Sequence, residues 1–336
     1  MKHQTLLALY IGLAAAAPLN AKWQRLPSLN DKPVEIGAQG MNSMATIASA
    51  AGLGKPESLL SADPTDPVSV AAGNSQAVIS LQQLTMINRS SFVSDGIEGR
   101  ATISGSADNK GWAVLDEKVF TAADREIVFA FAGMQVKFIK LEFALSKGGN
   151  IRHFEMFGSA RDKDHVVKQR ASDEKKGYPV NFAGVGGSRV IYASPNPQNG
   201  KEEAVAFNKF EFPESDDRYR TLIYDLGQLR FLDSFGSVHS PRPVRFEVFS
   251  FDKLPEKEDW RGRLAFNPED FNVREPIAAA EDTRGLGYIK AKPAKLVAAR
   301  YVAMRWEPDF NPPAFVFYGG QLSGRSYVSQ AAAKAA

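Results

Sequence analysis

The chain contains no cysteine among its 336 residues. That absence excludes disulfides, thiolate metal ligands, a cysteine nucleophile and a lipid anchor attached through cysteine. The hydrophobic content of 44% is that of globular domains, which bury a core. Domains of this kind do not need disulfides for stability. The length is sufficient for two domains of ordinary size.

Histidine is also scarce, with four in the whole chain. His153, His165 and His239 lie beyond the N-terminal segment, and no two of them have a metal-ligand spacing. A Gly-x-Ser-x-Gly nucleophile turn is absent as well. Asp216 and Asp217 are adjacent acids on a predicted loop and do not define a glycosidase pair. The sequence therefore predicts no catalytic activity.

The chain also has no large excess of charge of either sign, because 41 basic and 38 acidic residues leave a net charge of only +3. Binding of nucleic acid needs basic residues concentrated on one face, so no nucleic acid partner is expected.

One apolar run stands at the N-terminus. It follows Lys2, extends over residues 6–17, and precedes small residues that permit cleavage after Ala21. This layout is that of a secretory signal peptide; an uncleaved anchor is the alternative, but the run is shorter than a bilayer span. No second long apolar run occurs, so no transmembrane segment is expected in the mature chain. We expect the mature protein to be secreted, or to lie in the periplasm or cell envelope.

A β-rich pattern is present twice. Each copy has a hydrophobic strand, a loop, a second strand and a closing strand, at residues 77–88, 100–108 and 137–143 and again at 221–232, 244–252 and 300–306. β-Branched and aromatic residues dominate these segments, and turn residues separate them. Many short strands at close spacing are typical of a β-sandwich or barrel. A period of about 145 residues indicates a duplicated domain rather than a solenoid repeat.

These signals predict an all-β chain of two tandem sandwiches. In the first half we expect separate strands at 76–81, 84–92, 100–107, 112–115, 126–131, 137–144 and 151–157. The predicted segments are a signal peptide at 1–21, a first sandwich at 35–160, a charged linker at 161–180, a second sandwich at 181–325 and a disordered tail at 326–336. The second sandwich carries an insertion at 254–298, in which the acidic stretch 268–282 can form a short helix or an irregular loop.

The strand series resembles the discoidin domain, also called the coagulation factor V/VIII C-type domain. Residues 221–226 followed by Gly227 match the hydrophobic-Asp-Leu-Gly strand of that family, and residues 300–306 match one of its final strands. The first copy departs from the pattern with Ser80-Leu81-Gln82 at the corresponding place. The resemblance implies a galactose-binding-like jelly roll in both halves, which does not by itself choose a ligand.

The resemblance also implies that loops at one end of each sandwich hold the ligand, which can be a glycan, a phospholipid head group or a protein. By this analogy the loops at 88–99 and 236–243 are the candidates. They offer Arg89 and Asp95 in the first copy and His239 and Arg242 in the second, side chains that can hydrogen-bond to sugar hydroxyls or acidic groups.

Many members of the family hold a structural calcium ion. Asp63 and Asp66 occupy the corresponding place, and oxygen ligands of this kind suit calcium. Both aspartates directly precede prolines, so turn formation is the alternative. The second copy has Asn208 in the matching stretch, which weakens the case for calcium there.

The sequence thus favours a secreted, non-catalytic protein that binds a glycan or another cell-surface component, with avidity if both ends engage. One alternative is a structural component of the envelope or extracellular matrix with an envelope protein as partner. A second alternative is an unusual glycoside-acting enzyme.

Overall fold

The computed structural model describes residues 23–30, 33–36, 45–158, 179–183, 188–258, 260–309 and 314–325. Within them strands dominate, and the helical segments are short: η2 (Pro56–Leu60), α2 (Lys201–Phe207) and α3 (Pro268–Asn272). The all-β expectation is confirmed, and α3 shows that, of the two alternatives for the acidic stretch of the insertion, its start forms the short helix. The predicted signal peptide, nearly all of the charged linker and the predicted tail lie outside the described residues.

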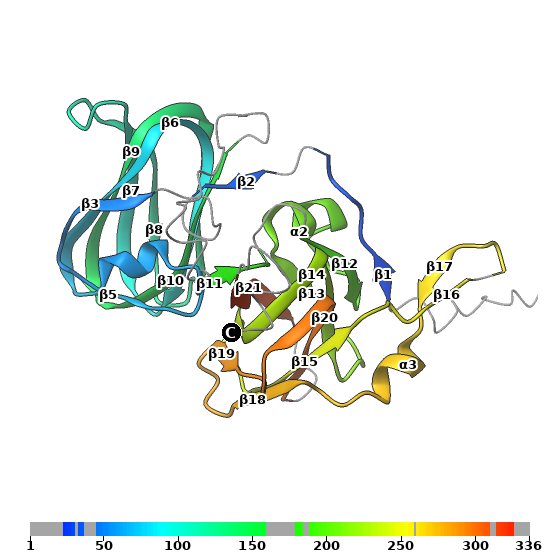
Figure 1. Cartoon of the computed structure of the whole chain (residues 1–336). Coiled ribbons are helices and arrows are strands. Elements are labelled where there is room, and N and C mark those ends of the chain that lie inside the picture. Colours follow the sequence, from blue (N-terminus) through cyan, green and yellow to red (C-terminus); the bar gives the residue numbers. More distant parts are fainter. Residues whose placement is uncertain are drawn as a thin grey trace, which may run out of the picture.

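All described strands except the hairpin β16–β17 belong to two large sheets, each folded over a core of its own (Figure 1). The N-terminal unit is built from β2 (Val34–Glu35), β3 (Thr46–Ala51), β4 (Leu53–Gly54), β5 (Val68–Val70), β6 (Gly73–Asp95), β7 (Glu98–Ser106), β8 (Ala113–Phe120), β9 (Glu126–Lys147) and β10 (Gly149–Gly158). The C-terminal unit is built from β1 (Gln24–Arg25), β11 (Pro179–Asn181), β12 (Arg189–Ser194), β13 (Phe210–Phe212), β14 (Arg220–His239), β15 (Val244–Phe251), β18 (Ala278–Asp282), β19 (Tyr288–Ala291), β20 (Val297–Pro308) and β21 (Phe315–Arg325).

The two units share a strand order. One layer runs β3-β6-β9-β7-β8 in the N-terminal unit and β12-β14-β20-β15-β18 in the C-terminal unit. In both, a long strand leaves this layer and continues in the second one: the far half of β6 pairs with β10, and the far half of β14 pairs with β21. The segments that look alike in the sequence therefore occupy matching places in the two sheets.

The long strands differ from the sequence prediction. Residues 76–81 and 84–92 form the single strand β6, and 126–131 and 137–144 form the single strand β9. Their pairing shifts register between Ser80 and Thr85, which marks an irregularity in the ladder. Such irregularities bend a strand without ending it, which explains how one strand serves two layers.

The expected loops at 88–99 and 236–243 are also largely strand, because β6 extends to Asp95 and β14 to His239. The polar side chains of β6 favour a loop by composition, but several of them are buried in the sheet. Ser90, for example, is fully buried and its hydroxyl donates to the Glu155 carbonyl at 2.8 Å. Polarity was a misleading loop signal here because buried hydroxyls are acceptable once they are hydrogen-bonded.

The insertion forms a third layer on the C-terminal unit. It contributes the hairpin β16 (Glu256–Glu258) and β17 (Leu264–Phe266), followed by α3. Phe266 and Phe271 pack against Tyr192 and Phe249 of the sheet in a small second core. In Figure 1 the hairpin projects from the side of the C-terminal unit that faces away from the N-terminal unit.

The N-terminal segment belongs with the C-terminal unit. β1 pairs antiparallel with β12, and Leu26 is buried in the main core of the C-terminal unit. The chain then crosses to the N-terminal unit, where β2 pairs with β10 (Figure 1). Residues 23–26, which we call the strap, thus tie the start of the chain to its second half.

Candidate functional site

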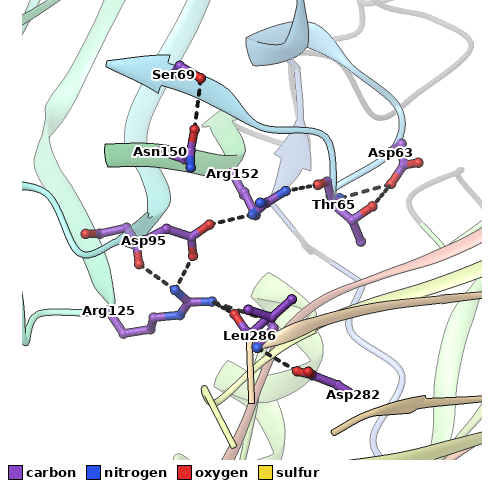
Figure 2. A network of polar contacts seen from close by, with 11 residues as sticks. Asp63, Thr65, Ser69, Asp95, Arg125, Asn150, Arg152, Asp282 and Leu286 are labelled. Atoms are coloured by element: carbon purple, nitrogen blue, oxygen red, sulfur yellow. Dashed lines mark hydrogen bonds and ion pairs between the residues drawn. The ribbon is translucent and has the colours of Figure 1, made fainter. Parts of the chain in front are cut away.

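The residues predicted to bind ligand or calcium lie where the two units meet, a region we call the junction. Figure 2 shows Asp95 between two arginines of its own unit. Its carboxylate accepts from Arg152 Nε at 2.6 Å and forms a second ion pair with Arg125. The Arg152 side chain is only 5% exposed and also donates to the Thr65 carbonyl. Asp95 is therefore the shared counter-ion of two arginines that are largely removed from water.

Both arginines reach the C-terminal unit. Arg125 Nη2 donates to the carbonyl oxygens of Leu286 and Gly287 at 3.5 and 3.4 Å. The Arg152 guanidinium lies over the Tyr288 ring, 3.7 Å from its centre, a distance at which cation–π attraction is strong. The geometry gives Asp95 a structural task, because it orients the two cations that hold the other unit.

Asp63 and Asp66 also face the C-terminal unit. Lys290 Nζ lies 2.5 Å from Asp63 and 3.4 Å from Asp66. Burial disfavours the charge of Lys290, but the hydrogen bond to Asp63 and the two carboxylate charges outweigh it and raise the lysine pKa. Asp63 also accepts from the Thr65 amide and hydroxyl, as a turn-forming aspartate does.

No group of three or more acidic or histidine side chains is arranged to hold a metal ion in the described part of the chain. The calcium site at Asp63 and Asp66 stays a prediction, in which the ion would compete with Lys290 for the same oxygens. Asn208 ends α2 in the left-handed conformation and accepts from the Tyr224 hydroxyl at 3.2 Å.

His239 was expected on an exposed loop, and that placement is wrong. It is the last residue of β14 and is 0% exposed, with its ring stacked on Phe315 and Nδ1 3.3 Å from the Ser237 hydroxyl. Burial, reinforced by the charge of Arg125, lowers the pKa of His239 to about 3. The residue is therefore a neutral part of the core at ordinary pH.

The two remaining candidates also lie against protein. The Arg89 guanidinium lies over the Phe207 ring of α2, 4.2 Å from its centre. The backbone of Arg242 lies so close to Gly285 that a Cβ on that glycine would be 3.0 Å away. A role of Arg89, Asp95 and Arg242 in ligand binding stays a prediction, while the structure gives each of them a place in packing.

A buried histidine also fits closely into the junction. His153 has φ of 49°, a conformation that most side chains avoid, and its ring lies against the backbone of Gly319. We expect Gly319→Ala to lower the free energy of unfolding by about 1–3 kcal/mol, because the added methyl would overlap the imidazole. Urea denaturation would measure this.

The matched test of that contact is a double-mutant cycle. In a His153→Ala background the ring is gone, so Gly319→Ala should cost little further stability. An equal cost in both backgrounds would show that the histidine is not the obstacle.

The structure also contains an open groove that the sequence did not reveal. It has a volume of about 540 Å³ and lies between the insertion and the outer face of the sheet; we call it the insertion groove. The residues that line it include Trp23, Tyr192, Tyr219, Phe266, Asn267 and Arg305. They come from the strap, the sheet and the insertion, so the groove combines aromatic rings with hydrogen-bonding groups.

A buried ion pair forms one end of this groove. Arg305 donates from Nε and Nη2 to one oxygen of Glu247, at 2.9 and 2.6 Å, and both residues are less than 10% exposed. The guanidinium lies 4.3 Å from the centre of the Tyr219 ring. Because Glu247 compensates the charge of Arg305, this end of the groove offers the Tyr219 ring beside a cation that already has its counter-ion.

A second, acidic hollow of about 520 Å³ lies at the end of the sheet where β14 and β15 begin. Its carboxylates come from Asp216, Asp217, Glu281, Asp282, Glu307 and Asp309. Some of them are already engaged: Asp282 accepts from the Gly287 amide at 3.0 Å, and Glu307 pairs with Arg218. Asp217 lines both the hollow and the insertion groove.

No family model and no curated protein matches the chain. Solved structures do, over about a third of it. They include CBM32-3 from a family 31 glycoside hydrolase of Clostridium perfringens, with 12% identity over 34% of this chain and 90% of that one and a TM-score of 0.30. Chitosan-binding module 1 of a chitosanase/glucanase from Paenibacillus sp. IK-5 is 18% identical over 36% of this chain and 98% of that one, with a TM-score of 0.30.

A third similar structure is CpGH89CBM32-5 from Clostridium perfringens, solved in complex with GalNAc-β-1,3-galactose. It is 13% identical over 36% of this chain and 100% of its own, with a TM-score of 0.31. Separately, the helices of the described residues are all too short or too polar to cross a membrane.

Proposed function

We propose that this chain is a non-catalytic binding protein that recognises glycans through the insertion groove. The observation that carries the proposal is an open groove in which aromatic rings stand beside polar side chains, with Trp23 and Tyr219 next to Asn267 and Arg305. A pyranose presents an apolar face of C–H groups and a rim of hydroxyls, so a site for it needs an aromatic surface together with hydrogen-bonding groups.

The proposed ligand site, the insertion groove, differs from the loops that the sequence predicted. The sequence suggested the loops at 88–99 and 236–243, but candidates from both copies, Asp95 and His239, lie in the junction. The insertion groove is open to solvent and lies on the C-terminal unit alone. The function falls in the same class as the carbohydrate-binding modules named above, but the groove is what supports it. We further propose that the chain acts outside the cytoplasm, after removal of the leader that ends near Ala21.

The test is binding of residues 22–336 to a broad glycan array, followed by titration of the best ligand. We expect Tyr219→Ala to weaken binding about tenfold, since an aromatic contact contributes about 1 kcal/mol beyond its buried area. The matched control is Trp260→Ala, because Trp260 is 83% exposed in the turn between β16 and β17 and is not part of the groove wall.

Two results would overturn the proposal. One is the absence of binding to every glycan on the array. The other is equal weakening by Tyr219→Ala and Trp260→Ala, which would move the site away from the groove. Mass spectrometry of the bound glycan should show no cleavage. Capture of envelope proteins without any glycan binding would favour the structural alternative.

A further inference from the structure

The strap builds one wall of the insertion groove. Gln24 and Arg25 pair with Ala193 and Tyr192 of β12, and the Leu26 amide donates to the Ile191 carbonyl at 2.9 Å. These contacts fix the backbone of the three residues that follow Trp23. The first residues of the described chain are thus as firmly placed as a strand of the sheet.

Trp23 itself packs against the insertion. Its ring centre lies 4.2 Å from that of Phe266, and Phe271 meets it edge-on at 5.8 Å. The indole is half-buried and lines the groove. An aromatic ring that is held by neighbours on one side and open to a groove elsewhere is pre-organised to stack on a flat ligand surface.

The charges near this wall are compensated. Arg25 Nη1 lies 3.4 Å from a Glu256 oxygen, and the Tyr192 hydroxyl donates to the same oxygen at 2.5 Å. Burial, together with the hydrogen bond to Glu256, raises the Tyr192 pKa, so the hydroxyl stays a donor at all ordinary pH values. Arg305 is paired with Glu247 as well, so both arginines that line the groove have a carboxylate partner.

One polar group in the groove lacks a partner. The Asn267 side chain is 7% exposed, and its amide nitrogen has no hydrogen-bond acceptor in the described structure. The Asn267 backbone amide is already used by the Pro255 carbonyl at 2.7 Å, so only the side chain is unsatisfied. Because Asn267 follows Phe266 and precedes Pro268, an acceptor that reaches it would be flanked by apolar surface.

From these contacts we infer that Trp23 and Asn267 form a subsite for a neutral sugar that carries an acetamido group. The sugar ring stacks on Trp23, the acetamido carbonyl accepts from Asn267 Nδ2, and the acetamido methyl packs against the apolar wall. A hydroxyl would supply the acceptor but no methyl, and a carboxylate would find the two arginines of the groove, Arg25 and Arg305, already paired with glutamates. This inference rests on the proposed glycan function and gives it a ligand class.

The experiment compares two probes, methyl N-acetyl-β-D-glucosaminide and methyl β-D-glucoside, by NMR titration of residues 22–336. We expect the acetamido sugar to bind at least tenfold more tightly. Trp23→Ala should weaken both probes about tenfold, whereas Asn267→Ala should remove the preference and leave the glucoside nearly unchanged. Trp260→Ala is the control and should change neither.

Failure of the acetamido subsite and failure of the glycan-binding function would give different results. If the array identifies glycan ligands but neither Trp23→Ala nor Asn267→Ala affects them, or if the two probes bind equally, the subsite is wrong and the function stands. If no glycan binds at all, the function itself fails. Should Trp23→Ala unfold the chain, Trp23→Phe retains a ring for packing; it should weaken both probes less and keep the acetamido preference. Loss of that preference in Trp23→Phe alone would contradict the assignment to Asn267.

Discussion

Asp95→Ala should lower the free energy of unfolding by about 3–5 kcal/mol, because it leaves two buried arginines without their counter-ion. The side chains of Arg152 and Arg125 are 5% and 14% exposed, so water cannot replace the lost carboxylate. Arg125 also holds the Leu286 carbonyl of the other unit, so the junction should loosen together with the N-terminal unit. Urea denaturation gives the loss, and small-angle X-ray scattering reports any separation of the units.

The control for this variant is Asp252→Ala, since Asp252 is an exposed acid in the turn after β15. We expect a change within about 0.5 kcal/mol for it. Asp95→Asn keeps the shape of the side chain and tests the charge; it should lie between the wild type and Asp95→Ala. Equal stability of Asp95→Ala and Asp252→Ala would mean that the arginines find other partners and that Asp95 does not organise the junction.

The all-β class was predictable because strand residues leave a local signal. β-Branched and aromatic residues near Ile127, Phe143 and Trp306 alternate over short distances, and these side chains are buried as expected. What the sequence could not show is where a strand bends. The bulged strands β6 and β9 each read as two separate strands, since a register shift between neighbouring strands is not visible in one segment alone.

The junction was not predictable for a different reason. Asp63, Asp66 and Asp95 resemble ligand residues in sequence because they are polar and stand near turns. Their partners are distant in the chain: Lys290 lies 224 residues after Asp66. A lone chain cannot reveal which acid meets which base across such a separation, so residues that hold two units together were interpreted as ligand contacts.

The residues of the insertion groove are likewise far apart in the sequence and meet only in the folded chain. Trp23, Tyr192, Tyr219, Asn267 and Arg305 belong to five separate segments, and no short motif contains two of the aromatic members. Trp23 lies in a polar stretch that contains proline, and its composition does not indicate a place in a groove. Only the pairing of the two-residue strand β1 with β12 brings it to the groove.

Acid should destabilise this chain well above the pH at which carboxylates titrate, because two histidines are buried without charge. Burial lowers the pKa of His153 from 6.5 to about 4, and burial with the charge of Arg125 lowers that of His239 to about 3. As the pH falls below 6.5, these histidines bind protons in the unfolded chain but not in the folded chain. The free energy of unfolding therefore decreases as the pH falls. The loss continues down to the folded pKa and levels off below it.

Between pH 7.5 and 4.5 the two histidines together should remove about 5 kcal/mol, roughly half from each. Urea denaturation across this range measures the slope. Groups that face them include Glu155 at 3.3 Å from His153 and Asp282 at 4.0 Å from His239; strong pairing on protonation would shrink the effect.

Histidine variants show whether the buried imidazoles stay neutral in acid or are protonated and paired with a carboxylate. His153→Asn suits the left-handed backbone and removes one titrating group, so its stability should fall about half as steeply with acid. The control is His165→Asn, since the sequence places His165 in the predicted charged linker; this variant should keep the full slope. If His153→Asn retains the full slope, the imidazole is charged in the folded chain, and Glu155 rather than burial sets its protonation.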